Sequence, residues 1–102
     1  MAEVKWSLPA IEEVEVIRDY YRRESPKYAE AFIDKVFAIT RRLEVFPKSG
    51  RVLPEIGDES IRELIYNHHR IIYWCEDDFV EILTVIHSSR QFGGLQGMDP
   101  GE

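Results

Sequence analysis

The chain is poor in cysteine, with only Cys75 among its 102 residues. A single thiol cannot form a disulfide within the chain, which excludes a small secreted domain held together by disulfides. Cys75 lies in the apolar run RIIYWC, so we expect a buried and unreactive thiol in a reducing compartment. The scarcity of cysteine therefore favours a cytoplasmic protein.

Long apolar runs are also missing. The N-terminal stretch MAEVKWSLP has no apolar core of the kind that a signal peptide carries. No apolar run approaches the roughly 20 residues that cross a bilayer. We expect neither export nor a membrane partner, and the hydrophobic share of 44% is typical of a globular domain.

Positive charge is scarce, because 13 Lys and Arg residues stand against 19 Asp and Glu residues, for a net charge of −6. Broad, charge-driven binding of nucleic acid needs a basic surface, so this function class is disfavoured. A small local basic cluster is still compatible with these totals. Metal ligands are sparse too, because His68 and His69 have no Cys or carboxylate partner at ligand spacing. We expect no metal and no other cofactor.

The sequence does contain a regular succession of helix and strand patterns. Residues 3–6 alternate polar and apolar side chains, which predicts a short strand. Apolar residues recur at helical spacing over residues 10–23, after Ser7 as the N-cap. Ser25 and Pro26 start a second helix that ends before Pro47. The short break between the two helices predicts an antiparallel helical hairpin.

Three strands follow, over residues 61–66, 70–75 and 79–87, and their short polar connections predict an antiparallel meander. Residues 51–57 form an irregular or weakly extended crossover before them. The predicted order is β-α-α-β-β-β, and the fold class is α+β, with the helical hairpin packed on one face of an antiparallel sheet. We assign residues 1–92 to this domain and the glycine-rich residues 93–102 to a flexible C-terminal tail.

The faces of the sheet depend on the turns, because side chains alternate along a strand. A two-residue turn at Asp77 and Asp78 would place an apolar set on the helix side: Ile71, Tyr73, Cys75, Val80, Ile82, Thr84 and Ile86. The open face would then hold Arg70, Ile72, Trp74, Glu81, Leu83, Val85 and His87. From the second helix, Phe32, Val36 and Phe37 are expected to pack on the apolar set. A one-residue change in turn length would reverse the two faces.

This register pairs Cys75 with Val80, Tyr73 with Ile82, Ile71 with Thr84, and Arg70 with Val85. A second two-residue turn at Asn67 and His68 would bring Glu63 diagonal to Arg70. We therefore expect Arg70 on the open face, close to the imidazole of His87 and to carboxylates.

His87, Arg90 and Arg70 have catalytic potential. Cleavage of RNA by its own 2′-hydroxyl needs an acid or base, for which His87 is suited, and cations for the phosphate, such as Arg70 and Arg90. The structural alternative is that His87 ends a strand, Arg90 lies at its rim, and Arg70 forms an ion pair with Glu63 or Glu81. A surface that binds the target or nucleic acid would comprise Arg62, Arg70, Tyr73, Trp74 and Arg90. Of these, Tyr73 or Trp74 could stack on a base, whereas Arg62 is expected to bond locally.

Several segments together resemble the RelE/ParE toxin superfamily, from Val4 to Arg90: WSLPAIEEVEVIRDYY, SPKYAEAFIDKV, FPKSGRVLPE, IRELIYNHHRIIYW and VEILTVIHSSR. The most specific pieces are P-x-x-G-R at Pro47 to Arg51, the IREL strand, and RIIY followed by I-L-x-V-x-H-x-x-R. Their order and spacing carry the resemblance.

The resemblance implies the toxin half of a type II toxin–antitoxin module, with a cognate antitoxin as partner in a toxin–antitoxin hetero-oligomer. RelE-like members cut messenger RNA in the ribosomal A site, and ParE-like members inhibit DNA gyrase without known catalysis. The IREL and RIIY strands and the H-x-x-R ending are closer to the ParE-like branch. The sequence has no lysine after Lys48, and Phe92 lacks the hydroxyl of the RelE-type aromatic, which also favours ParE.

We therefore expect a growth inhibitor that acts on DNA gyrase. The alternative is a ribosome-dependent endoribonuclease that acts on messenger RNA, and a third interpretation is a remnant of a plasmid-stabilisation module whose only partner is its antitoxin. The question of enzymatic activity stays open at this point. A helix or strand of the antitoxin is expected to cover the apolar part of the open face, at Ile72, Trp74, Leu83 and Val85.

Overall fold

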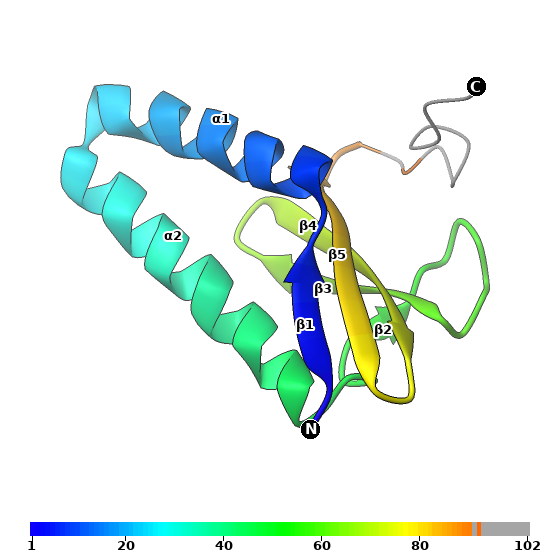
Figure 1. Ribbon diagram of the computed structural model, residues 1–102. Helices are drawn as coiled ribbons and strands as arrows, with labels where there is room; N and C mark the ends of the chain where they lie inside the picture. Colours follow the sequence, from blue (N-terminus) through cyan, green and yellow to red (C-terminus); the bar gives the residue numbers. More distant parts are fainter. Residues whose placement is uncertain (91, 93–102) are drawn as a thin grey trace.

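The computed structural model describes residues 1–90 and 92. Its elements, in chain order, are β1 (Glu3–Trp6), α1 (Leu8–Glu24), α2 (Pro26–Arg41), the 3₁₀ turn η1 (Arg42–Glu44), β2 (Arg51–Val52), β3 (Ile61–Tyr66), β4 (His69–Glu76) and β5 (Phe79–His87). The predicted α+β class and the helical hairpin on one face of the sheet are confirmed (Figure 1). The predicted tail, residues 93–102, lies outside the described residues.

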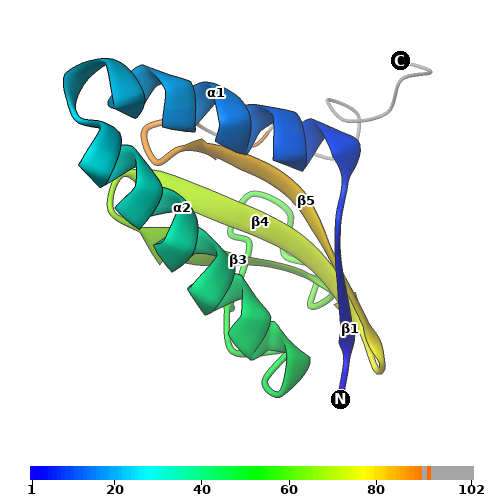
Figure 2. The same ribbon diagram turned by 60° about the vertical axis from the view of Figure 1, so that its left-hand side comes forward.

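The sheet has the strand order β1-β5-β4-β3-β2. The pairs of β2 with β3, β3 with β4, and β4 with β5 are antiparallel, whereas β1 lies parallel to β5. The short strand β2 was not predicted, because residues 51–57 carry no alternating pattern. In Figure 2 the two helices lie together on one side of the sheet, with β1 at its edge. Within the described residues, no helix is long and apolar enough to cross a membrane.

Both helices begin at the serine caps that the sequence predicts. The hydroxyl of Ser7 accepts a hydrogen bond from the Ala10 amide at 3.2 Å, and that of Ser25 accepts one from the Tyr28 amide at 3.1 Å. These bonds satisfy amides that have no partner within the first helical turn. Pro26 follows Ser25 directly and cannot extend α1, so the chain reverses there and α2 returns beside α1.

The main core lies between the helices and the sheet. It includes Ala10, Val14, Phe32, Val36, Leu43, Ile71, Tyr73, Cys75, Val80, Ile82 and Val85. The predicted burial of Phe32, Val36 and Cys75 is confirmed. The prediction for Phe37 is wrong: its side chain is 42% exposed and packs on Trp6, with ring centroids 4.9 Å apart. Phe37 lies one residue past Val36 and therefore projects from the flank of the α2 stripe.

A second apolar cluster covers the face of the sheet that was expected to be open. It contains Leu53, Ile61, Ile72, Ile86 and Phe92. The segment between β2 and β3 crosses this face, so Ile72 is fully buried under protein and is unavailable to a partner. The expectation of an open apolar surface at Ile72 and Val85 is wrong, whereas Trp74 and Leu83 are half-buried.

A β-bulge in β5 changes the register halfway along the sheet. Tyr73 pairs with Ile82 as predicted, but Ile72 pairs with Thr84, so Leu83 is an extra residue. The predicted pair of Ile71 with Thr84 is wrong, because Ile71 lies opposite Val85. The bulge reverses the faces of the end of β5: Val85 joins the helix-side core, and Ile86 joins the second cluster.

Candidate functional site

The bulge separates His87 from Arg70. Arg70 pairs with Ile86, not with the predicted Val85, and His87 pairs with His69. The His87 ring lies on the helix side, 6.0 Å from the ring of His69 and stacked at 6.1 Å on that of His68. Its Nδ1 accepts a hydrogen bond from the Ser89 amide at 3.1 Å. The predicted cluster of Arg70 and His87 on one face is therefore absent among the residues that the structure describes.

Arg70 is buried and its guanidinium is held within the protein. Its Nε donates to Glu63 at 2.6 Å, and its Nη1 and Nη2 donate to the two carboxylate oxygens of Glu55 at 2.6 and 2.8 Å. Nη1 also donates to the backbone oxygen of Arg90 at 2.9 Å. The predicted ion pair with Glu63 is thus confirmed, and Glu55 is a second partner that the sequence did not indicate. A fork occupied in this way has little capacity left for a phosphate.

The charges of this network stabilise one another. The hydrogen bonds from Arg70 lower the pKa of Glu55 from 4.5 to about 2, and the Glu55 carboxylate raises the pKa of Arg70. The Glu63 side chain is fully buried and also accepts a hydrogen bond from Arg51. Two arginines therefore compensate a carboxylate that would be unfavourable alone in the interior.

Tyr73 and Arg62, two predicted binding residues, hold a loop instead. The Tyr73 side chain is fully buried; its hydroxyl donates to the Pro47 oxygen at 2.8 Å and accepts from the Gly50 amide at 2.9 Å. Burial raises the pKa of Tyr73 to about 12. Arg62 donates to the Gly50 oxygen at 3.0 Å, so the predicted local bonding of Arg62 is confirmed.

These contacts explain why the P-x-x-G-R segment has proline, glycine and arginine at these positions. A Cβ atom on Gly50 would lie 2.5 Å from the backbone oxygen of Glu63 and 2.6 Å from the Tyr73 hydroxyl oxygen. Both distances are shorter than van der Waals contact. Only glycine allows the backbone to approach this closely. Pro47 supplies the carbonyl for Tyr73, and Arg51 supplies the second cation for Glu63.

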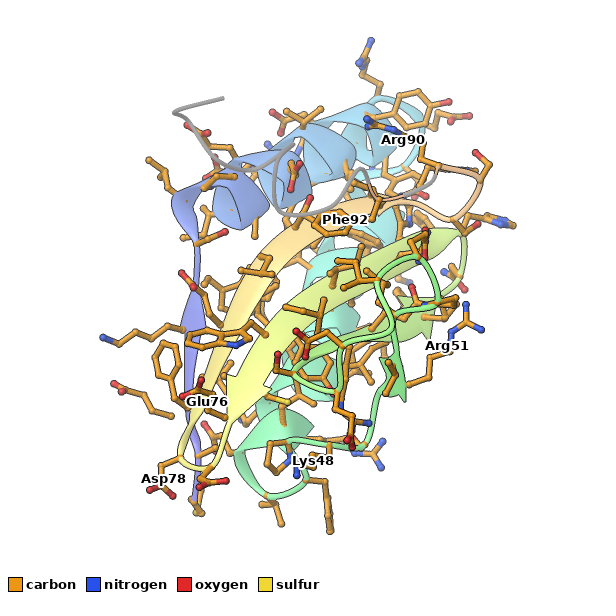
Figure 3. All side chains as sticks on the ribbon, turned by 90° about the vertical axis from the view of Figure 1, so that its right-hand side faces the viewer. Lys48, Arg51, Glu76, Asp78, Arg90 and Phe92 are labelled. Carbon is orange, nitrogen blue, oxygen red and sulfur yellow. The ribbon has the colours of Figure 1, made fainter. Side chains whose placement is uncertain are left out.

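Trp74 and Arg90 are the accessible members of the predicted set. Trp74 is half-buried on the second-cluster side, edge-on to Phe79 with ring centroids 5.6 Å apart. Arg90 is exposed at the end of the sheet that lies away from Lys48 (Figure 3). The backbone oxygen of Arg90 accepts a hydrogen bond from Arg70, and Arg90 also lines a shallow hollow beside Glu55 and Arg70.

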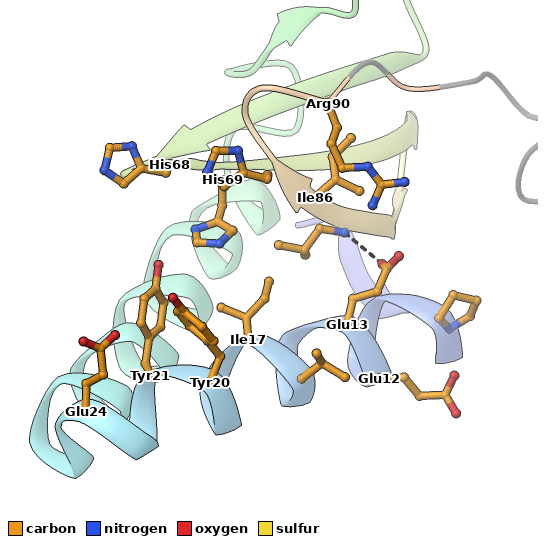
Figure 4. Close-up of a pocket in the computed structure, with 14 residues that line it drawn as sticks. Glu12, Glu13, Ile17, Tyr20, Tyr21, Glu24, His68, His69, Ile86 and Arg90 are labelled. Carbon is orange, nitrogen blue, oxygen red and sulfur yellow. Dashed lines mark hydrogen bonds between the residues drawn. The ribbon is translucent and has the colours of Figure 1, made fainter.

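A groove of about 870 Å³ runs between α1 and the end of β5 (Figure 4). Its apolar lining comes mainly from Val16, Ile17, Tyr20, Tyr21, Val85 and Ile86, and its polar lining from Glu12, Glu13, Glu24, His68, His69, His87 and Arg90. Glu13 secures the groove, because its Oε1 accepts from the Thr84 hydroxyl at 2.7 Å and from the Val85 amide at 3.1 Å. Nothing in the sequence distinguishes Glu13 from the other glutamates in the first turns of α1, so its role was not predicted.

His69 is the buried histidine of this lining. It is 5% exposed, packs edge-on against Phe32 and Tyr21, and its Nδ1 has no hydrogen-bond partner in the described residues. Burial lowers the pKa of His69, and nearby His87 and His68 lower it further. The predicted strand over residues 70–75 starts one residue too late, because His69 opens β4. Among the described residues, no three His, Cys, Asp or Glu side chains converge on a point that could hold a metal ion.

Known toxins share the sequence pattern and the fold of this chain. A family model described as the ParE toxin of the type II toxin–antitoxin system parDE matches residues 4–92. The chain is 29% identical over 91 residues to Toxin RelE2 of Caulobacter vibrioides, covering 88% of this chain and 99% of that protein. A solved structure of the chromosomal ParDE system from P. aeruginosa superposes with a TM-score of 0.72 at 18% identity, over 85% of this chain and 96% of that one. The chain belongs to the family of ParE toxins of type II toxin–antitoxin systems.

Proposed function

We propose that this ParE-family toxin arrests growth by binding DNA gyrase and that a cognate antitoxin neutralises it. The observation that carries the choice of a binding mechanism is the occupied guanidinium of Arg70, whose three nitrogens all donate to Glu63, Glu55 or Arg90. Catalysis at a phosphate needs free cations near the acid or base. Among the residues that the structure describes, Arg90 is the only cation that lines the groove with His87. The net charge of −6 also favours a protein target over a nucleic acid.

Expression of the toxin without antitoxin tests this function. If gyrase is the target, DNA replication stops first and translation continues until later, because ribosomes do not need gyrase for elongation. The rates of thymidine and amino-acid incorporation measure the two processes in the same culture. An immediate stop of translation with continued replication contradicts the gyrase assignment.

For the antitoxin we propose the groove between α1 and β5 as a binding surface. Val16 and Tyr20 are exposed apolar side chains on its α1 wall, and Glu12 and Glu24 add negative charge. This chemistry suits an amphipathic segment with apolar anchors and basic flanks. Val16→Lys should weaken antitoxin binding by about tenfold or more. Ile65→Lys, an exposed position on β3, is the matched control, and equal affinity of the two variants would contradict the placement.

A ribosome-dependent endoribonuclease is the second candidate. It is supported by the exposed His87, which shares the groove with Arg90, and by the relative whose name is Toxin RelE2. A general acid or base contributes a factor of about 10²–10⁴ in rate, so His87→Gln would abolish toxicity if this candidate were correct. We expect His87→Gln to keep most of its growth inhibition. Loss of messenger cleavage in His87→Gln, with antitoxin binding intact, would favour the nuclease.

A further inference from the structure

The loop after α2 exposes large apolar side chains beside positive charge. Val45 is 58% and Phe46 is 60% exposed, and neither belongs to the two core clusters of the described residues. Residues 41–51 contain four basic residues and one acidic residue, although the whole chain carries a net charge of −6. We call Val45, Phe46, Pro47 and Lys48 the Phe46 loop. An exposed aromatic side chain next to cations is typical of the energetically dominant residues in protein interfaces.

Hydrogen bonds from the buried interior hold this loop in one conformation. At its start, the Phe46 amide donates to the Arg42 oxygen at 2.9 Å. In its middle, the Tyr73 hydroxyl donates to the Pro47 oxygen at 2.8 Å, and Arg62 donates to the Lys48 oxygen at 3.3 Å. A loop that is fixed before binding loses little conformational entropy when a partner docks. The buried Tyr73 and the half-buried Arg62 therefore pre-organise an exposed surface to which they contribute no contact area of their own.

The chemistry of the surroundings favours a protein partner. A shallow depression beside the loop is lined by Arg42, Phe46 and Lys48 on one side and by Glu76 and Asp77 on the other. In Figure 3, Lys48 lies at the same end of the molecule as Glu76 and Asp78. A nucleic-acid backbone carries only negative charge and would meet the carboxylates unfavourably. A protein surface can oppose the cations with carboxylates, avoid the acidic wall and offer an apolar pocket to the aromatic ring.

We propose that the Phe46 loop is the surface through which this toxin holds its protein target, with Phe46 inserted in an apolar pocket and Arg42 and Lys48 opposite acidic residues. The identity of that target rests on the proposed function. The loop follows the C-terminal end of α2, and in Figure 3 Lys48 lies at the opposite end of the molecule from Arg90, which lines the groove assigned to the antitoxin. Separate surfaces allow variants that lose the target and keep the antitoxin.

The first test is growth arrest after expression of Phe46→Ser without antitoxin, with Leu8→Ser as the matched control because Leu8 is 67% exposed on α1. Phe46→Ser should raise the toxin level needed for arrest by about tenfold or more, the loss expected for an aromatic anchor. Leu8→Ser should arrest growth like the unsubstituted toxin. Lys48→Glu should weaken arrest, and Lys27→Glu, at the start of α2, should not.

Two further measurements separate the outcomes. Antitoxin affinity, measured by calorimetry, should be unchanged in Phe46→Ser, which shows that the variant is folded. Phe46→Ser should also inhibit the supercoiling activity of purified gyrase less strongly than the unsubstituted toxin does, by a factor similar to its loss of growth arrest.

If Phe46→Ser arrests growth at the same expression level as the unsubstituted toxin, the Phe46 loop is not the target surface, whatever the target is. If Phe46→Ser loses arrest but the unsubstituted toxin leaves gyrase active, the surface stands and the gyrase assignment fails. If a DNA or RNA duplex binds the toxin and Lys48→Glu alone abolishes that binding and arrest, a nucleic acid replaces the protein partner.

Discussion

The amide nitrogen of Gly50 lies 2.9 Å from the hydroxyl oxygen of Tyr73, although the two residues are 23 positions apart in the chain. This bond joins the loop after α2 to the centre of the sheet. The same Tyr73 hydroxyl donates a hydrogen bond to the backbone oxygen of Pro47. The contact depends on a residue without a Cβ atom at position 50. It links the most recognisable motif of the sequence, P-x-x-G-R, to the geometry of an exposed loop.

Gly50→Ala should therefore destabilise the protein. The added methyl group would lie 2.5 Å from the Glu63 backbone oxygen and 2.6 Å from the Tyr73 hydroxyl, so one of them must move. Overpacking of this kind costs about 1–3 kcal/mol in free energy of unfolding. Urea denaturation measures the loss, and Ser49→Ala, at an exposed neighbouring position, is the control. Equal stability of Gly50→Ala and Ser49→Ala would show that the close approach is absent in solution.

Arg70→Met should also cost stability, through the charges that it leaves behind. The methionine fills a similar volume, but the Glu63 carboxylate stays fully buried with Arg51 as its remaining cation. Removal of one partner from a buried ion pair typically costs about 3–5 kcal/mol. Thermal unfolding measures this loss. A simultaneous Glu63→Leu substitution should recover part of it, and a failure of the double variant to recover any would argue against an electrostatic cause.

Acid should unfold the protein partly through Glu55. Its pKa is lowered from 4.5 to about 2 by hydrogen bonds from Arg70, so the folded state favours the ionised carboxylate. The resulting stabilisation is fully present above pH 4.5 and is lost as the pH falls from 4.5 towards 2. Glu55→Gln should be less stable at neutral pH and should lose less stability across this window. Parallel pH profiles of the two proteins would contradict the ion pair.

His69 should make stability depend on pH in a higher range. Burial lowers its pKa from 6.5, so the folded state favours the neutral ring, and stability falls as the pH drops below 6.5. His69→Phe should reduce this dependence. It should also stabilise the protein by about 1 kcal/mol at neutral pH, because the unpartnered Nδ1 is removed from the core. His68→Phe, at an exposed neighbouring residue, is the control. A pH profile of His69→Phe that matches the original would rule out His69 as the cause.

The local rules of the chain were sufficient for most of the fold. Serine caps, helical spacing and two short polar turns are short-range signals, and they correctly predict the helical hairpin and the register from Glu63 to Ile82. The bulge at Leu83 has no such signal, since an extra residue in a strand of apolar side chains leaves the composition unchanged. The faces assigned to Val85, Ile86 and His87 were therefore reversed.

The candidate site was harder to predict for a second reason. Arg70 and Glu63 are neighbours on adjacent strands, so their ion pair follows from the register. Glu55 lies in an irregular crossover, and no periodicity indicates that this segment folds back over the sheet. The same crossover buries Ile72 through Leu53, which removed the apolar surface that the alternation of β4 had suggested.

If the toxin acts by binding DNA gyrase, purified toxin should inhibit purified gyrase with no ribosome present. In an assay that starts from relaxed plasmid, increasing doses of toxin should reduce the number of supercoils that gyrase introduces. Equimolar antitoxin added beforehand should restore gyrase activity. His87→Gln should inhibit as strongly as the unsubstituted toxin, because the proposed mechanism is binding and involves no proton transfer. Unchanged supercoiling at every dose, together with cleavage of messenger RNA in a reconstituted translation reaction, would rule out gyrase as the target and identify the toxin as a nuclease.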